Sequence, residues 1–120
     1  MSHVLLVEDD MLLAKHFMRV LEQDGMHVVH APHAGAAIQA IDRQPPDVIV
    51  LDVLLPAVSG FSLLHELRTY EDTAAIPTVV CTTMADDMPL ETLRSYGVDR
   101  LIDKATMQPA DIVTAVRAMT

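Results

Sequence analysis

The sequence predicts a doubly wound α/β sandwich, in which helices cover both faces of a parallel sheet, and two observations predict it. Short apolar runs alternate along the chain with segments whose apolar residues recur at helical spacing. The runs are almost uniformly apolar, as in strands buried on both faces, and strict alternation of strands and helices produces right-handed parallel crossovers. At 120 residues the chain has the size of one domain, so we expect a single domain over residues 1–120.

The first two strand and helix pairs lie in the N-terminal third of the chain. A strand candidate at 3–7 is followed by a helix over 11–24, which ends at Gly25, a residue type favoured just beyond helix ends. A second strand candidate at 27–30 precedes a helix that Gln-Pro-Pro at 44–46 terminates. Residues at helical spacing mark the apolar faces of the two helices: Leu13, Phe17, Val20 and Leu21, then Ala34, Ala37, Ile38 and Ile41.

The rest of the chain repeats this alternation. Pro56 and Gly60 separate the third strand from its helix, Pro77 and Pro89 stand before the next strand and helix, and Gly97 closes that helix. The prediction is therefore five strands and five helices. The remaining strands are expected at 47–53, 78–82 and 99–102, and the remaining helices at 61–70, 90–96 and 110–119.

Composition restricts the core and the compartment. With 51% hydrophobic but only 3% aromatic residues, the core must be built from aliphatic side chains and Met. No apolar stretch approaches the roughly 20 residues of a membrane helix, and acids follow the first apolar run, so we expect a cytoplasmic protein without membrane contact. The single cysteine, Cys81, is expected in the core and fits a reducing compartment.

The net charge of -9, with only eight Lys and Arg residues, argues against direct contact with nucleic acid. Phosphate binding needs clustered cationic side chains, and here they are scattered. If DNA is the final target of this protein, another chain or domain must contact it.

Polar groups stand where four of the five predicted strands end. These groups are Glu8-Asp9-Asp10, Asp52, Thr82-Thr83 and Asp103-Lys104. In doubly wound folds the functional groups lie at the carboxyl ends of the strands. We therefore expect one site, rich in carboxylates, at this edge of the sheet.

Clustered carboxylates repel one another, and a hard divalent cation relieves the repulsion. Oxygen ligands without nearby His or Cys suit Mg²⁺, which also accepts phosphoryl oxygens. A carboxylate can then act as a nucleophile toward phosphorus, while Lys104 and Thr82 stabilise the oxygens of the transferred group. This chemistry predicts that Asp52 becomes phosphorylated.

At these positions the chain resembles the receiver domain of two-component response regulators, similar to the chemotaxis regulators, from Val4 to Met119. The resemblance implies a flavodoxin-like three-layer sandwich with strand order 2-1-3-4-5. It is carried by VLLVEDD at 4–10, VIVLDVLLPAVSG at 48–60, Thr82 five residues after Pro77, and Lys104 at the end of the fifth strand.

The resemblance implies a role for each site residue. Asp52 would accept a phosphoryl group from the phosphohistidine of a sensor histidine kinase or a phosphotransfer protein. Glu8, Asp9, Asp52 and the backbone carbonyl of Leu54 would bind Mg²⁺, while Thr82 and Lys104 would contact the phosphoryl oxygens. Asp10 is instead expected to cap the first helix.

The resemblance also implies partners and limits the type of activity. The receiver would signal to a downstream effector protein or domain through a conformational shift, with a homodimer as one possible assembly. It would not be an enzyme, because it catalyses only its own phosphorylation and dephosphorylation. The kinase is expected to dock near the first helix and the edge around Asp52, by family analogy.

Three positions depart from the usual pattern of the family. Ala105 replaces the Pro that usually follows the lysine in a cis bond, a conformation that is costly before other residues. Leu101 replaces the aromatic switch residue, and Thr83 replaces a small Ala. We therefore expect phosphorylation with an unconventional coupling to the output surface.

Leu54 and Met84 occupy positions from which family members tune hydrolysis of the acyl phosphate. Both side chains are apolar and cannot orient a water molecule. We predict slow self-dephosphorylation.

Other function classes fit the sequence less well. His27, His30 and His33 suggest a metal site, but a spacing of three alternates faces in a strand, so we do not expect them to converge. A dehalogenase-type phosphatase would carry a second acid where Leu54 stands, and a flavodoxin-like electron carrier would carry a phosphate loop after the first strand. The main rival is a receiver-like interaction module that no longer depends on phosphorylation.

Overall fold

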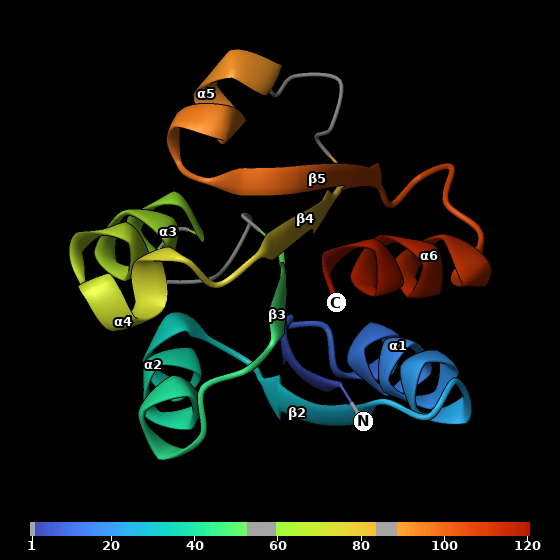
Figure 1. Ribbon diagram of the computed structural model, residues 1–120. Helices are drawn as coiled ribbons and strands as arrows, with labels where there is room; N and C mark the ends of the chain where they lie inside the picture. The colour runs from blue at the N-terminus through green and yellow to red at the C-terminus, as the bar shows by residue number, and fades with distance from the viewer. Residues whose placement is uncertain (1, 53–59, 84–88) are drawn as a thin grey trace.

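The computed structural model describes residues 2–52, 60–83 and 89–120. Their centre is a parallel sheet of five strands in the order β2-β1-β3-β4-β5, seen nearly edge-on in Figure 1. The predicted doubly wound fold and the strand order are both confirmed. The strands are β1 (His3–Val7), β2 (His27–Ala31), β3 (Val48–Leu51), β4 (Thr78–Thr82) and β5 (Val98–Asp103).

Helices cover both faces of the sheet, with α1 and α6 on one side and α2, α3 and α4 on the other (Figure 1). Among the described residues there are six helices, so the prediction of five is wrong by one. The helices are α1 (Met11–Gln23), α2 (Ala34–Arg43), α3 (Gly60–Thr69), α4 (Glu71–Ala74), α5 (Leu90–Ser95) and α6 (Pro109–Met119).

The helix missing from the prediction is α4, a single turn. Its four residues, EDTA, are too few to show an apolar period. Glu71 and Asp72 lie in its first turn, where acids are favourable, and the buried Thr73 hydroxyl donates to the Leu67 carbonyl at 2.6 Å. Tertiary contacts therefore stabilise α4, and its own sequence period does not indicate it.

Two separate, mainly aliphatic cores lie on the two faces of the sheet. Alternate strand residues point to opposite faces, so β1 contributes Leu5 and Val7 to one core and Val4 and Leu6 to the other. The first core is closed by α2, α3 and α5, and the second by α1 and α6. Cys81 is buried in the second core, as predicted, and burial raises the pKa of its thiol to about 12.

The predicted helix ends agree with the structure. Asp10 caps α1 by accepting from the backbone N–H groups of Leu12 and Leu13, both at 3.1 Å. Gly25 and Gly97 follow α1 and α5 with φ of 86° and 76°, in the left-handed region that favours glycine. Local sequence chemistry therefore determines where these helices begin and end.

One arginine connects several elements beside Gly97. The guanidinium of Arg68, at the end of α3, donates to the carbonyls of Tyr96 and Gly97 after α5, at 2.9 and 2.8 Å. It also donates to the Ile76 carbonyl at 3.1 Å and to the Thr78 hydroxyl at 3.0 Å. Arg68 thus joins α3, the start of β4 and the turn that leads into β5.

Each helix of the described chain is too short or too polar to cross a lipid bilayer.

Candidate functional site

The site residues stand one position beyond, or at the last position of, their strands. Thr82 is the last residue of β4, whereas Glu8, Asp52 and Lys104 follow β1, β3 and β5 directly. Sheet hydrogen bonds hold their backbones: Glu8 N–H to Ala31 O at 3.1 Å, Asp52 N–H to Val7 O at 3.1 Å, and Lys104 N–H to Thr82 O at 3.0 Å. The sheet itself therefore brings the four residues to one edge.

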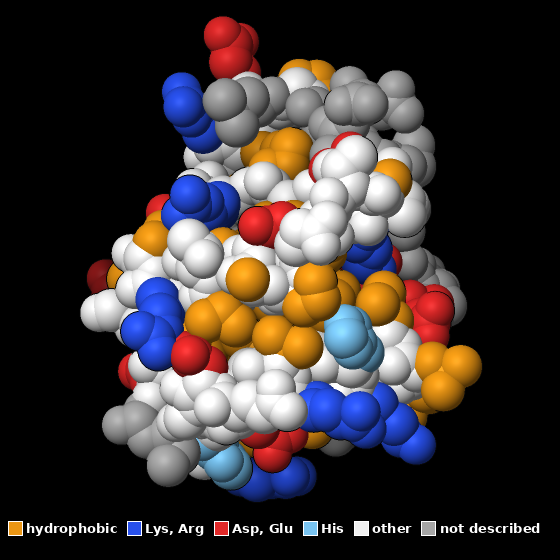
Figure 2. All heavy atoms as spheres, turned by 90° about the vertical axis from the view of Figure 1, so that its right-hand side faces the viewer, with side chains coloured by type: hydrophobic (Ala, Val, Ile, Leu, Met, Phe, Trp, Pro, Cys, Tyr) orange, Lys and Arg blue, Asp and Glu red, His pale blue; other side chains and the backbone are white. Residues whose placement is uncertain are grey.

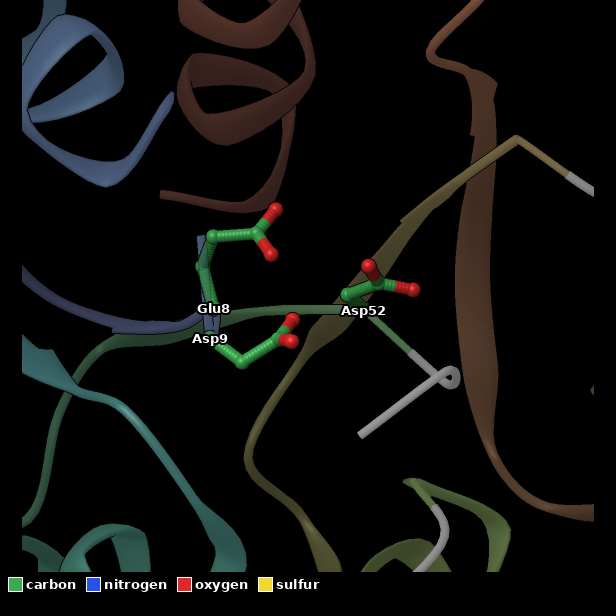
Figure 3. Close-up of side chains that lie close together, drawn as sticks. All are labelled: Glu8, Asp9 and Asp52. Atoms are coloured by element: carbon green, nitrogen blue, oxygen red, sulfur yellow. The ribbon is translucent and has the colours of Figure 1, made fainter. Parts of the chain in front are cut away.

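Three carboxylates gather at this edge. Glu8, Asp9 and Asp52 each offer an oxygen, and these oxygens all lie within 4.8 Å of one another. In Figure 3 the carboxylates of Glu8 and Asp9 extend from the end of β1 toward the side on which Asp52 stands. Glu8 and Asp52 are buried and Asp9 is exposed, so the cluster opens to solvent on the side of Asp9.

Lys104 reaches into the cluster and pairs with two of the three acids. Its Nζ lies 2.7 Å from Asp52 Oδ2 and also donates to Glu8 Oε1. The three side chains are 10%, 9% and 2% exposed, so the ion pairs are buried. The peptide bond from Lys104 to Ala105 is trans, and the ammonium reaches both carboxylates without the cis bond that is usual for the family.

Burial and charge oppose each other in this network. Burial raises the pKa of Glu8, and the Lys104 ammonium only partly offsets this effect. Burial alone would lower the pKa of Lys104, but the hydrogen bonds to Asp52 and Glu8 and the negative charges of these two carboxylates together outweigh burial and raise it. Three carboxylates face one ammonium, so the cluster retains an excess of negative charge that a cation can neutralise.

His30 supports the site and was missed by sequence reasoning. Its Nε2 donates to the Glu8 carbonyl at 2.7 Å, from the neighbouring strand β2. The contact depends on the register that pairs Leu6 with His30, and no spacing in the sequence indicates that register.

The three histidines of the series 27, 30 and 33 have separate partners. His27 stacks on His3 with ring centroids 5.0 Å apart, and His30 bonds to Glu8. His33 Nδ1 accepts from the Ala36 N–H at 3.1 Å and caps α2. The prediction that the three imidazoles do not converge is confirmed.

The other predicted site positions differ in their burial. Thr82 is fully buried at the edge of the site, and Thr83 beside it is exposed. Leu101 is half-buried and packs against the core that α2, α3 and α5 close. Leu54 and Met84 lie outside the described residues.

Comparison with known proteins agrees with this geometry. The family model of the response regulator receiver domain matches residues 4–117. Over 118 residues the chain is 30% identical to the transcriptional regulatory protein CseB of Streptomyces coelicolor, covering 98% of this chain and 49% of CseB. The chain thus spans about half the length of curated relatives such as CseB and PhoB of Escherichia coli.

Solved structures show the same arrangement of elements. The BeF3-activated N-terminal receiver domain of RstA from Klebsiella pneumoniae superimposes with a TM-score of 0.87 at 29% identity, covering 98% of this chain and 97% of that one. The chemotaxis protein CheY4 of Vibrio cholerae superimposes with a TM-score of 0.90 over 100% and 99% of the two chains, and at 21% identity it shows the shared fold.

Proposed function

We propose, from the premise that this chain belongs to the response regulator receiver domain family, that Asp52 accepts a phosphoryl group from a histidine kinase or phosphotransfer protein. One observation carries the proposal: the carboxylate of Asp52 lies within 4.8 Å of two further carboxylates while Lys104 Nζ approaches it to 2.7 Å. A nucleophile, a candidate cation site and a fixed positive charge therefore meet at one point.

The reaction transfers a phosphoryl group between a nitrogen and an oxygen. An oxygen of the Asp52 carboxylate forms a bond to phosphorus while the bond from phosphorus to the donor imidazole nitrogen breaks. The electron pair of that bond stays on the imidazole, and the product is an acyl phosphate on Asp52. Enzyme chemistry on other substrates is not part of this function, because the acceptor is the protein itself.

The residues present fit Mg²⁺. Glu8, Asp9 and Asp52 offer hard oxygen ligands, and the described residues bring no His or Cys ligand into the cluster. The backbone carbonyl of Leu54 is proposed as a further ligand. When bound there, Mg²⁺ supplies positive charge for the oxygens of the incoming phosphoryl group.

Lys104 and Thr82 are proposed to contact the transferred group. Lys104 already touches Asp52, so its ammonium needs to move only from a carboxylate oxygen to an oxygen of the phosphoryl group attached there. Thr82 lies beside Lys104, at the end of β4. The carbonyl of Thr82 accepts a hydrogen bond from the Lys104 N–H. On the side away from β1, the Lys104 ammonium would neutralise negative charge and the Thr82 hydroxyl would donate a hydrogen bond to a phosphoryl oxygen.

The kinase or phosphotransfer partner is proposed to dock beside α1. Met11 and Leu12, directly after the cap of α1, are 52% and 81% exposed. A cavity of about 210 Å³ lies next to them, lined by Leu13, His16, Phe17, Lys104, Met107 and Pro109. Figure 2 looks onto the face of α1 and α6, where hydrophobic side chains gather among Lys and Arg side chains. Exposed apolar side chains next to the acceptor are suited to a partner that must deliver a phosphoryl group.

The test is intact mass after incubation with Mg²⁺ and acetyl phosphate. We expect a gain of one phosphoryl group that disappears in Asp52→Asn and when Mg²⁺ is chelated. Asp24→Asn is a matched control at an aspartate outside the site, and it should gain the group like the wild type.

The alternative function is an interaction module that does not depend on phosphorylation. Ala105, Leu101 and Thr83, which depart from the family pattern, favour it. It would replace our proposal if no phosphoryl group were gained from acetyl phosphate and none from a panel of phosphorylated histidine kinases.

A further inference from the structure

A second hollow lies far from the acidic cluster, between α2, α3 and α4. Its volume is about 230 Å³, and Figure 1 shows these three helices together on the side of the sheet opposite α1 and α6. We call this hollow the α2–α4 groove. Its described lining includes an apolar floor and an acidic rim, which we describe in turn.

The floor of the α2–α4 groove is apolar. Ile41 and Leu67 are buried side chains of α2 and α3, and Ile38 is half-buried beside them. Tyr70, at the end of α3, is 56% exposed and is one of three exposed large apolar side chains in the described chain. An aromatic ring that is about half exposed and lies next to aliphatic side chains is suited to contact with another apolar side chain.

The rim of the groove is acidic. Asp42, Glu66 and Asp72 line it, all three are exposed, and no Lys, Arg or His is among its described lining residues. Ion pairs of the described chain are formed by Glu8, Asp52 and Asp24, and none involves these three carboxylates. The groove therefore presents unneutralised negative charge around an apolar floor.

We propose that the α2–α4 groove docks a basic amphipathic segment of a partner protein. Such a segment would place a Leu- or Phe-type side chain against Tyr70, Ile38 and Leu67. Its Lys or Arg side chains would pair with the acidic rim. Charge complementarity selects this partner, because an acidic segment would be repelled by the rim and by the net charge of -9.

The groove lies near the amino ends of the strands, and the proposed phosphorylation site lies at their carboxyl ends. The groove is built from the C-terminal halves of α2 and α3 and from α4, which follows α3. Helices of parallel crossovers run opposite to the strands, so these helix ends lie near the amino ends of the strands. Asp52 stands at a carboxyl end. A partner in the groove therefore leaves Asp52 open to a phosphoryl donor.

The test is a nuclear magnetic resonance titration of the full chain with synthetic helical peptides. Each peptide carries a Leu stripe flanked by Lys and Arg, and the panel varies the spacing between these residues. We expect saturable shifts confined to residues around Ile38, Leu67 and Tyr70. A peptide with Glu in place of every Lys and Arg should produce none.

Two matched variants separate docking from general attraction to a negatively charged protein. Asp42→Asn with Glu66→Gln should weaken binding by about three- to tenfold, because two exposed charge pairs are lost. Glu22→Gln with Glu91→Gln removes the same charge from other helices and should leave the affinity unchanged. Tyr70→Ala should also weaken binding.

Three results would overturn the proposal. They are shifts spread over the whole surface, equal weakening by the two double variants, and the absence of saturable shifts at the groove with every peptide. The titration is repeated with Asp52→Asn, and the same shifts are expected. If Asp52 is not phosphorylated, peptide binding at the groove is still expected. If no peptide binds at the groove, phosphorylation of Asp52 is still expected.

Discussion

At the scale of single residues, Lys104 is the only cation among the described site residues, and its removal gives a clear prediction. In Lys104→Met the buried carboxylates of Glu8 and Asp52 lose their ion pairs with this lysine. Without Mg²⁺ at neutral pH we expect the free energy of unfolding to fall by about 3 kcal/mol, because breaking a buried ion pair leaves charge uncompensated. Urea denaturation measures the loss.

The pH dependence of that loss follows from the raised pKa of Glu8. Lys104 is the main influence that lowers this pKa, so the variant raises it further above 4.5. A carboxyl whose pKa is higher in the folded state binds its proton more tightly there, so the variant regains stability as the pH falls through that pKa. Mg²⁺ should stabilise the variant more than the wild type. Lys15→Met, at an exposed lysine of α1, should change little, and a loss independent of pH would contradict the prediction.

Residue types at the strand ends were sufficient to predict the acidic cluster. Glu8, Asp9 and Asp52 were expected together because parallel strands bring their carboxyl ends to one edge, and the structure places them there. Ala105 replaces the proline that usually follows the lysine, and the trans bond at this position still allows Lys104 to contact Asp52. His30 could not be predicted, because its bond to Glu8 depends on the pairing of two strands.

At the scale of elements, the two glycines that end α1 and α5 give a matched pair of predictions. Both have positive φ, so Ala at either position strains the backbone by about 1 kcal/mol. A Cβ at Gly25 meets open space, but at Gly97 it would collide with the guanidinium of Arg68. Arg68 bonds to the carbonyls of Tyr96, Gly97, Ile76 and Ala74, and the collision would disturb them.

We expect Gly25→Ala to lower the free energy of unfolding by about 1 kcal/mol and Gly97→Ala by about 3 kcal/mol, since hydrogen bonds of a charged group are lost as well. Chemical denaturation of both variants gives the comparison. Equal losses would show that Arg68 moves aside without cost. Arg68→Met combined with Gly97→Ala should lose less than the sum of the two single changes.

Element boundaries were predictable where local chemistry sets them. Asp10, Gly25 and Gly97 mark helix ends as expected. The strand predicted at 47–53 is longer than β3, which covers Val48–Leu51, because residue types alone do not show where sheet pairing starts and stops. The short α4 was missed because no local sequence pattern marks it. Its stabilising contacts, such as the hydrogen bond from the Thr73 hydroxyl to the Leu67 carbonyl, come from tertiary structure.

At the scale of the whole molecule, we predict weak coupling between Asp52 and β5. Leu101 packs against the core and has no polar group to bond with the Thr82 hydroxyl. Structures with and without the phosphoryl mimic beryllium trifluoride should superimpose closely around Leu101. Leu101→Tyr, which supplies a ring and a hydroxyl, should give larger shifts there. A large shift in the wild type would contradict the prediction.

The alternation of strands and helices predicted the class of fold, and the family resemblance supplied the strand order that the structure confirms. Periodicity alone cannot order strands, because parallel crossovers can move in either direction along a sheet. The α2–α4 groove was also not predictable. Asp42 and Glu66 are 24 positions apart in the sequence and line one groove only because α2 and α3 lie on the same side of the sheet.

The hydrogen bonds that hold Glu8, Asp52 and Lys104 come from their backbones, so these bonds remain when a side chain is exchanged. In evolutionary terms, the fold can be conserved while the side chains of the site change. One codon change at position 52 removes the proposed nucleophile without removing the backbone bond from the residue 52 N–H to the Val7 carbonyl. A lineage can therefore lose or regain the proposed phosphorylation while it keeps the sheet that positions the site.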